Sequence, residues 1–527
     1  MKQQKELRGE KRMDIDKRIF EKWSQIDKRF KYSFFVCIIM GICAHLFIIS
    51  GYYPNNDMLY CSITSNDDLT TGRWFLTYIS DVSSKLTLPT VIGLIAIFFV
   101  ALTSVYIIKI FDIRQIWIGC LCAMLLVTFP TISSAFSWMF TADAHMIAMF
   151  MGTFAVYIMI SKSWKWLPVS MLLLGLSIGT YQSYLAFAMM LCLGYIILSI
   201  LKEKDFHIFY LIGKFLVGGL GGSVVYLLGL LYRLNANNLE LGTHKGVNQM
   251  GQMGIKEIVL AIKNSYWNVF TFLRGDYCFH ISRWAEILYV MFFAIVLGSG
   301  IYLIARMKIH KKRFVMIVLL VAVGSAPIAL SIVLFTSPSV EVYTLMIQQF
   351  VLIFVLGLAI FDMLYQKINK KEKYGKILSC CIMICCLGIV WQYVLIDNAG
   401  YSNLYFRYQK SYALVTKISM EIDQIKGMDG DTTLYMYGNP NSVGYPWWGG
   451  NAYISDVAGT EGGLLPGDNP RLHYMLYDFI GQYIPYETDQ EVVDAIVKSE
   501  DFSEMPTWPE KGAIKKINNT VVIKMPQ

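Results

Sequence analysis

Two acidic side chains stand where apolar segments of the sequence meet polar loops, and they are the first candidates for chemistry. Asp57 closely follows the first apolar run, and Asp143 lies where the fourth begins. A carboxylate beside a low-dielectric region can have its proton affinity raised toward the range of a general base. Two such acids can also hold a divalent cation, Mg²⁺ or Mn²⁺, through oxygen ligands. The simpler alternatives are solvation of Asp57 and helix capping at Asp143.

Three arginines form a second group of candidates. Arg233, Arg274 and Arg283 border or interrupt a loop on the side of the chain where few basic residues are expected. The rigid, permanently charged fork of arginine suits phosphate oxygens. Attraction to anionic headgroups and snorkelling are the alternatives. The sharper prediction is that one of the three binds the phosphate of a lipid-linked substrate.

Further polar and aromatic residues lie close to these groups along the chain. They are Asn56, Arg73, Trp74, His145, Tyr181 and Gln182. Tyr181 and Gln182 interrupt apolar sequence, and their polar groups suit either sugar binding or helix–helix contacts. Arg73 has the charge to brace Asp57. The aromatic segment 445–450 is suited to stacking on sugars or to packing against a membrane.

The composition indicates the elements that must position these residues. The chain has 527 residues, of which 55% are hydrophobic and 16% charged, with a mean hydropathy of +0.47. The apolar residues gather in runs of about 18–24, long enough to cross a hydrocarbon core of roughly 30 Å. This pattern excludes a cytosolic enzyme, a nucleic-acid binder and a disordered scaffold. It predicts a polytopic α-helical membrane protein.

We predict about eleven transmembrane helices from these runs. They cover 32–50, 86–109, 116–134, 145–161, 166–180, 184–201, 209–232, 285–305, 314–335, 343–364 and 377–396. The runs 166–180 and 184–201 are nearly continuous, and they form either one broken helix or two short spans joined by a tight turn. Residues 255–275 are apolar on one face and predict a helix lying on the membrane surface.

Lys and Arg are concentrated in alternate loops, which predicts the orientation of the protein. The basic N-terminal segment 1–31 has no signal-peptide pattern and belongs to the cytoplasmic side with these loops. Eleven spans then place the C-terminus outside. Residues 397–527 carry a net charge of −7. Since the whole chain carries +8, residues 1–396 carry a net charge of +15. We predict a multi-pass protein of the bacterial cytoplasmic (inner) membrane.

The chain divides into three predicted parts. Residues 1–31 are a cytoplasmic segment, and 32–396 are a transmembrane domain with outer loops at 51–85 and 233–285. Residues 397–527 are a small extracytoplasmic α/β domain, with strand-like stretches at 432–437 and 520–524 and a helix-like stretch at 490–499. Most of the cysteines lie in apolar runs as small buried hydrophobes. Cys61 and Cys278 fall in polar loops and can pair on an oxidising side.

The order and spacing of three motifs resemble the type II glucosyltransferases, a family of bacterial polytopic membrane proteins related to the GT-C glycosyltransferases. The motifs are Pro54-Asn55-Asn56-Asp57 followed by Gly72-Arg73-Trp74-Phe75, then Met139-Phe140-Thr141-Ala142-Asp143, then Gly179-Thr180-Tyr181-Gln182-Ser183-Tyr184. The family often has histidine where this chain has Asn56. The resemblance implies a GT-C-like fold, a polyprenyl-phosphate sugar donor and an acceptor glycan, such as an O-antigen or cell-wall polysaccharide.

We therefore predict a glycosyltransferase that moves a hexose such as glucose from a lipid-phosphate donor to a surface polysaccharide. Asp57 would deprotonate or orient the acceptor hydroxyl, and Asp143 would position the acceptor or help to hold a cation. An outer arginine would neutralise the leaving phosphate. Two alternatives stay open: a flippase of lipid-linked sugars, and a non-catalytic protein of polysaccharide assembly. A flippase predicts inverted repeats and mid-membrane charges, and the sequence has neither.

Overall fold

The structure is a computed structural model that describes residues 16–18, 21–59, 68–83, 86–202, 208–367, 373–442, 457–460 and 463–527. Cys61 and the aromatic segment 445–450 lie outside the described residues. The Cys61–Cys278 pair and the stacking role of that segment therefore stay predictions.

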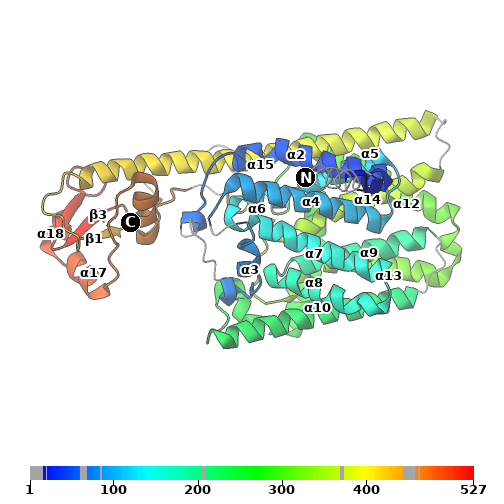
Figure 1. Ribbon diagram of the computed structural model, residues 1–527, viewed down its shortest axis with the longest axis horizontal. Coiled ribbons are helices and arrows are strands. Elements are labelled where there is room, and N and C mark those ends of the chain that lie inside the picture. Colours follow the sequence, from blue (N-terminus) through cyan, green and yellow to red (C-terminus); the bar gives the residue numbers. More distant parts are fainter. Residues whose placement is uncertain are drawn as a thin grey trace, which may run out of the picture.

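The membrane part is a bundle of apolar helices (Figure 1). Its long helices are α2 (Lys28–Ile49), α4 (Pro89–Phe111), α5 (Ile116–Val127), α6 (Pro130–Ser137), α7 (Ala142–Ser161), α8 (Leu167–Thr180), α9 (Tyr184–Leu201), α10 (Ile208–Ala236), α12 (Arg283–Arg306), α13 (Arg313–Leu330), α14 (Val351–Lys367) and α15 (Lys373–Ile422). Ten stretches of the described chain are long and apolar enough to cross a membrane, some of them combining adjacent helices. The predicted bundle of apolar, membrane-length helices is confirmed.

The run 166–180 accounts for the difference from the predicted count of eleven. It forms α8, whose 14 residues extend only about 21 Å. Residues 181–183 then turn the chain into α9, so the two short helices joined by a tight turn are the correct alternative. The predicted surface helix is present as α11 (Ile255–Leu273), and its position at a membrane surface stays a prediction.

Three of the predicted spans are interrupted or shortened in the structure. The predicted span 116–134 is interrupted where Pro130, which has no backbone N–H, starts α6 as its first residue. The predicted span 314–335 ends early, because α13 stops at Leu330 and a short turn, η7 (Ile332–Phe335), follows. Residues 344–350 likewise form two short turns, η8 (Thr344–Met346) and η9 (Gln348–Phe350), before α14 begins.

Several of the predicted cytoplasmic loops meet at one end of the bundle. The Lys202 ammonium lies 3.1 Å from the Asp112 carboxylate, which joins the ends of α9 and α4. Arg29, at the start of α2, donates to the Ile113 carbonyl over 2.8 Å. The turn 181–183 and the start of α7 lie at the other end. Which end faces the cytoplasm stays a prediction.

Helix α15 joins the bundle to the C-terminal domain without a break (Figure 1). The predicted domain boundary at 396/397 falls inside this helix of 50 residues. Its last turns supply Leu414, Val415, Ile418 and Ile422 to the core of the C-terminal domain. The domain is therefore built on the end of a helix that begins in the bundle.

The C-terminal domain contains a three-stranded sheet in the order β1-β3-β2. Strand β1 (Thr433–Tyr437) pairs in parallel with β3 (Thr520–Lys524), and β2 (Ile514–Ile517) pairs with β3 antiparallel. The short helices are α16 (Asn469–Met475), α17 (Gln490–Val497) and α18 (Glu500–Glu504). The predicted strands and helix of this domain are present.

Candidate functional site

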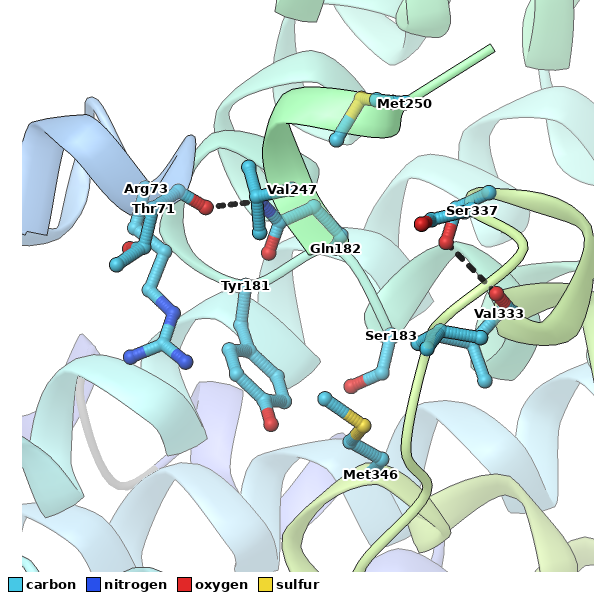
Figure 2. Close-up of a pocket in the computed structure, with 12 residues that line it drawn as sticks. Thr71, Arg73, Tyr181, Gln182, Ser183, Val247, Met250, Val333, Ser337 and Met346 are labelled. Atoms are coloured by element: carbon cyan, nitrogen blue, oxygen red, sulfur yellow. Dashed lines mark hydrogen bonds between the residues drawn. The ribbon is translucent and has the colours of Figure 1, made fainter. Parts of the chain in front are cut away.

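A pocket at the end of the bundle opposite Lys202 is lined by segments that lie far apart in the sequence. It is lined by Thr71, Arg73, Tyr181, Gln182, Ser183, Val247, Met250, Val333, Thr336, Ser337, Val340 and Met346 (Figure 2). Arg73 is the charged residue among them, and we call this cavity the Arg73 pocket. Its other polar groups are hydroxyls and one amide, which hydrogen-bond without adding charge.

Gln182 fixes the loop that carries Arg73. Its side-chain nitrogen donates to the Thr71 carbonyl over 3.0 Å, which is drawn as a dashed line in Figure 2. Between them Gly72 has a φ of 82°, and a Cβ at this position would lie 2.7 Å from the Gln182 amide nitrogen. Glycine is therefore needed for both the backbone conformation and the close approach.

Tyr181 holds the guanidinium of Arg73 in the pocket. The cation lies over the ring, 4.9 Å from its centroid, and Figure 2 shows the two side chains next to each other. The Tyr181 hydroxyl donates to the Tyr343 hydroxyl over 3.1 Å. Burial raises the pKa of Tyr181 far above its ordinary value, so the ring stays neutral and presents its face to the cation.

His145 packs behind Tyr181 and is not part of the pocket lining. Its ring meets the Tyr181 ring edge-on at a centroid distance of 4.8 Å, and its Nδ1 lies 3.4 Å from the Tyr184 hydroxyl. The side chain is 2% exposed. The structure therefore gives His145 a position behind Tyr181 that supports the tyrosine ring.

Asp57 is exposed and lies on the short turn η1 (Asp57–Leu59). The Asn55 side chain shapes this turn by accepting the backbone N–H groups of Asp57 and Met58, each over 3.0 Å. The indole N–H of Trp138 donates to the Asp57 carboxylate over 2.8 Å. Asn55 therefore sets the backbone of the motif, while Trp138 orients the acid.

Asp143 differs from Asp57 in being fully buried, with an exposed fraction of 0%. One carboxylate oxygen accepts the backbone N–H of Ala144 over 2.8 Å at the N-terminal end of α7. The other has no hydrogen-bond partner of ordinary geometry among the described residues, although the Ser83 hydroxyl lies nearby. This position combines a helix-end interaction with an incompletely satisfied buried oxygen.

The C-terminal domain reaches back to the Asp57 side of the site. Arg407 on α15 donates to the Asn56 side chain and, over 2.8 Å, to the Gly463 carbonyl. Leu59 is buried in the core of the C-terminal domain. Asn56 is therefore a link between the bundle and this domain.

A short segment of the C-terminal domain, residues 457–460, inserts against the bundle. The Ala458 carbonyl accepts the Ser134 hydroxyl over 2.9 Å, and the Ala458 N–H donates to the Thr344 hydroxyl over 3.2 Å. Gly459 has a φ of 87°, and a Cβ there would collide with the Ser137 hydroxyl and the Trp138 ring. The segment therefore packs against Trp138, the residue that orients Asp57.

Tyr343 and Thr344 connect the two halves of the site. Tyr343 bonds to Tyr181 at the Arg73 pocket, and the next residue, Thr344, bonds to Ala458 beside Trp138. The acid and the cationic pocket are thus joined by a continuous series of contacts. We interpret them as parts of one site.

Trp74 occupies a packing position between two helices. Its ring fits against Gly179 of α8 and Gly229 of α10, and a Cβ on Gly179 would lie 2.8 Å from the indole. The neighbouring Phe75 N–H donates to the Gly179 carbonyl over 2.9 Å. Trp74 therefore anchors the loop that carries Arg73.

The three arginines predicted to bind phosphate sit on separate elements. Arg233 donates to the Tyr78 hydroxyl over 2.6 Å, with its guanidinium 4.9 Å from the centroid of that ring. Arg274 is exposed 5.8 Å from the Phe270 ring centroid, and Arg283 is exposed at the start of α12. None of the three is among the residues that line the Arg73 pocket.

The part of the chain that the structure describes contains no group of three or more His, Cys, Asp or Glu side chains placed to hold a metal ion. Asp57 and Asp143 as ligands of Mg²⁺ or Mn²⁺ therefore stay a prediction.

Sequence reasoning missed several residues that build the site. Trp138 directly precedes the motif that ends in Asp143, and its position was a usable signal. Tyr343, Arg407 and Gly459 had no such signal, because they reach the site only through contacts between distant segments.

The bundle therefore combines membrane-length helices with a polar, cationic pocket and an oriented carboxylate, which suits a polytopic membrane enzyme. A sequence profile described as Glucosyl transferase GtrII matches residues 45–354, which is more than half of the chain. The chain belongs to this family, and the membership indicates a glucosyltransferase. The matched residues include both acids and the lining of the Arg73 pocket. No curated protein and no solved structure matched the chain.

The packing of Trp74 gives a first prediction. Gly229→Val places a side chain where the indole now lies, and overpacking of this kind costs about 1–3 kcal/mol. We expect a lower thermal unfolding temperature in detergent. Gly213→Val, on the same helix with no atom within 4 Å of its Cβ, is the control. Equal unfolding temperatures for the two variants would contradict the anchoring role.

The inserted segment gives a second prediction. Gly459→Ala adds a methyl group against Ser137 and Trp138, so the orientation of Asp57 is disturbed. We expect glucosyltransferase activity to fall about 10- to 100-fold. Gly481→Ala matches the backbone strain, with a φ of 84°, but meets no atom within 4 Å. A similar loss of activity in both variants would show that backbone strain, and not the contact with Trp138, is the cause.

Proposed function

We propose that this protein transfers a hexose, glucose by its family, from a polyprenyl-phosphate donor to a cell-surface or cell-wall polysaccharide at the outer face of the bacterial cytoplasmic membrane. The observation that carries the proposal is the Arg73 pocket. It combines one oriented guanidinium with hydroxyl and amide groups at the end of a bundle of membrane-length helices. A membrane lipid with a phosphate and a sugar offers the matching groups.

Arg73 is the residue that we propose for the donor phosphate. A guanidinium binds phosphate oxygens through a planar fork and keeps its charge at all physiological pH values. Charge grows on the phosphate as the bond to the sugar breaks, and a fixed cation stabilises that charge. The residue proposed to bind the phosphate is therefore Arg73, inside the pocket, in place of Arg233, Arg274 or Arg283.

Asp57 is the residue that we propose for the acceptor. Its exposed carboxylate takes the proton of the acceptor hydroxyl while that oxygen attacks the anomeric carbon of the sugar. The new bond joins the acceptor oxygen to the sugar. The bond between the anomeric carbon and the phosphate oxygen breaks, and polyprenyl phosphate leaves with the electron pair. Asp143, buried at the start of α7, positions this end of the bundle.

The distribution of charge supports the proposed side of the membrane. The contacts of Lys202 and Arg29 lie at the end of the bundle opposite the Arg73 pocket. The positive-inside rule assigns that basic end to the cytoplasm. The site and the C-terminal domain then face outward, where the domain is positioned to contact the polysaccharide.

Asp57→Asn tests the catalytic assignment. The amide cannot take the proton, so we expect kcat with a defined polyprenyl-phosphate glucose to fall about 10²- to 10⁴-fold. Asp81→Asn, an exposed aspartate that follows helix α3 (Leu76–Ser80), is the matched control. Retained glycan decoration in cells at normal protein levels would exclude Asp57 as the base. An absence of glycosidic-bond formation by the wild-type protein would favour a flippase.

Arg73→Gln tests the phosphate assignment. Loss of the cation is expected to lower kcat/KM about 10²-fold, and Arg73→Lys should recover only part of it, because the ammonium has no planar fork. The same measurement on Arg233→Gln, Arg274→Gln and Arg283→Gln separates the two assignments. If one of these three variants loses more kcat/KM than Arg73→Gln, the phosphate is bound by that arginine and not by Arg73.

A further inference from the structure

An apolar crevice lies in the bundle next to the Arg73 pocket. It is a cavity of about 270 Å³ lined by Val156, Met159, Leu174, Leu185, Ala188, Met189, Cys192, Leu193, Ile196, Ile212, Phe215, Leu216, Gly219, Ser325, Ile328 and Ala329. These side chains are apolar except for one thiol and one hydroxyl. Such a lining does not hold water, and it favours a hydrocarbon ligand.

Five helices line the crevice: α9, α10 and α13 supply most of the residues, and α7 and α8 supply Val156, Met159 and Leu174. Helix α9 packs against α13 and α10 packs against α8, and the cavity lies mainly between α9, α10 and α13 with α7 and α8 behind it. Near the inner end, Phe209 of α10 meets Phe314 of α13 with ring centroids 5.7 Å apart. Leu216, on the wall formed by α10, is 60% exposed on the surface of the bundle. The crevice is therefore accessible from the lipid side at the depth of the hydrocarbon.

The crevice continues from the Arg73 pocket along two chain segments. On one side, Ser183 lines the pocket and Leu185, two residues later, lines the crevice. On the other side, Ala329 lines the crevice and Val333, four residues later, lines the pocket. A single molecule with a charged head and an apolar chain can therefore occupy both cavities.

We propose that the crevice between α9, α10 and α13 binds the isoprenoid chain of the lipid donor next to its phosphate. The proposal rests on the proposed function for the nature of the head group. The pocket that it joins presents hydroxyls and an amide beside its cation, which favours a lipid whose head carries a sugar next to the phosphate. The first isoprene units lie in the crevice and the rest of the chain extends into the bilayer.

The experiment uses two glycines of α10 that both have open space around their Cβ positions. Gly219 lines the crevice and Gly213 does not, and a Cβ on either meets no atom within 4 Å. Gly219→Phe fills the crevice without a clash at its Cβ, and Gly213→Phe is the matched control. Transfer is measured with a long-chain polyprenyl-phosphate glucose and with a donor of two isoprene units.

We expect Gly219→Phe to raise KM for the long-chain donor about tenfold, with kcat and thermal stability unchanged and Gly213→Phe equal to wild type. The short donor should have a higher KM than the long one in the wild type. Equal KM values for both donors in all three proteins would overturn the proposal while leaving the proposed function intact. No transfer from either donor by the wild type would instead reject the proposed function.

A binding measurement tests the crevice independently of catalysis. Polyprenyl phosphate without sugar, carrying a diazirine in its second isoprene unit, is photolysed with the full-length protein in vesicles. We expect labelled peptides from α9, α10 and α13, with competition by unlabelled polyprenyl phosphate and much less by phosphatidylglycerol. Labelling confined to other helices, or equal competition by both lipids, would overturn the assignment of the isoprenoid chain.

Discussion

Hydrocarbon offers no hydrogen bonds to a protein backbone, and this constraint decides where the chain can place polar chemistry. Helices satisfy their own backbone through most of the bundle, so the candidate site is built where the helices stop. The turn 181–183, the loop around Arg73 and the short turns between Leu330 and Val351 are all interruptions of this kind. They meet at one end of the bundle, where their side chains supply the hydroxyls, the amide and the cation of the pocket.

The site separates a cation from an acid by means of packing. Arg73 is held over the neutral ring of Tyr181, whereas Asp57 is held by the indole of Trp138. Tyr343 and Thr344 lie between the two groups and contact both sides. The prediction that Arg73 braces Asp57 stays a prediction.

The C-terminal domain takes part in this arrangement although it lies outside the family match. Helix α15 carries it away from the bundle, yet residues 457–460 return to contact Ser134 and Thr344. Gly459 of this segment also packs against Trp138, whose indole N–H donates to Asp57. The C-terminal domain is therefore physically connected to the region that holds Asp57.

The sequence by itself determined the membrane bundle, most helix positions, the strands of the C-terminal domain and the motifs around Asp57, Arg73 and Tyr181, because run length and residue type are local properties. It did not determine which arginine enters a pocket: the sequence favoured Arg233, Arg274 or Arg283, whereas Arg73 lines the pocket. Only the tertiary structure decided this, together with the burial of Asp143 and the Asn56–Arg407 contact across 351 positions. These features depend on packing between distant segments, which spacing along the chain does not encode.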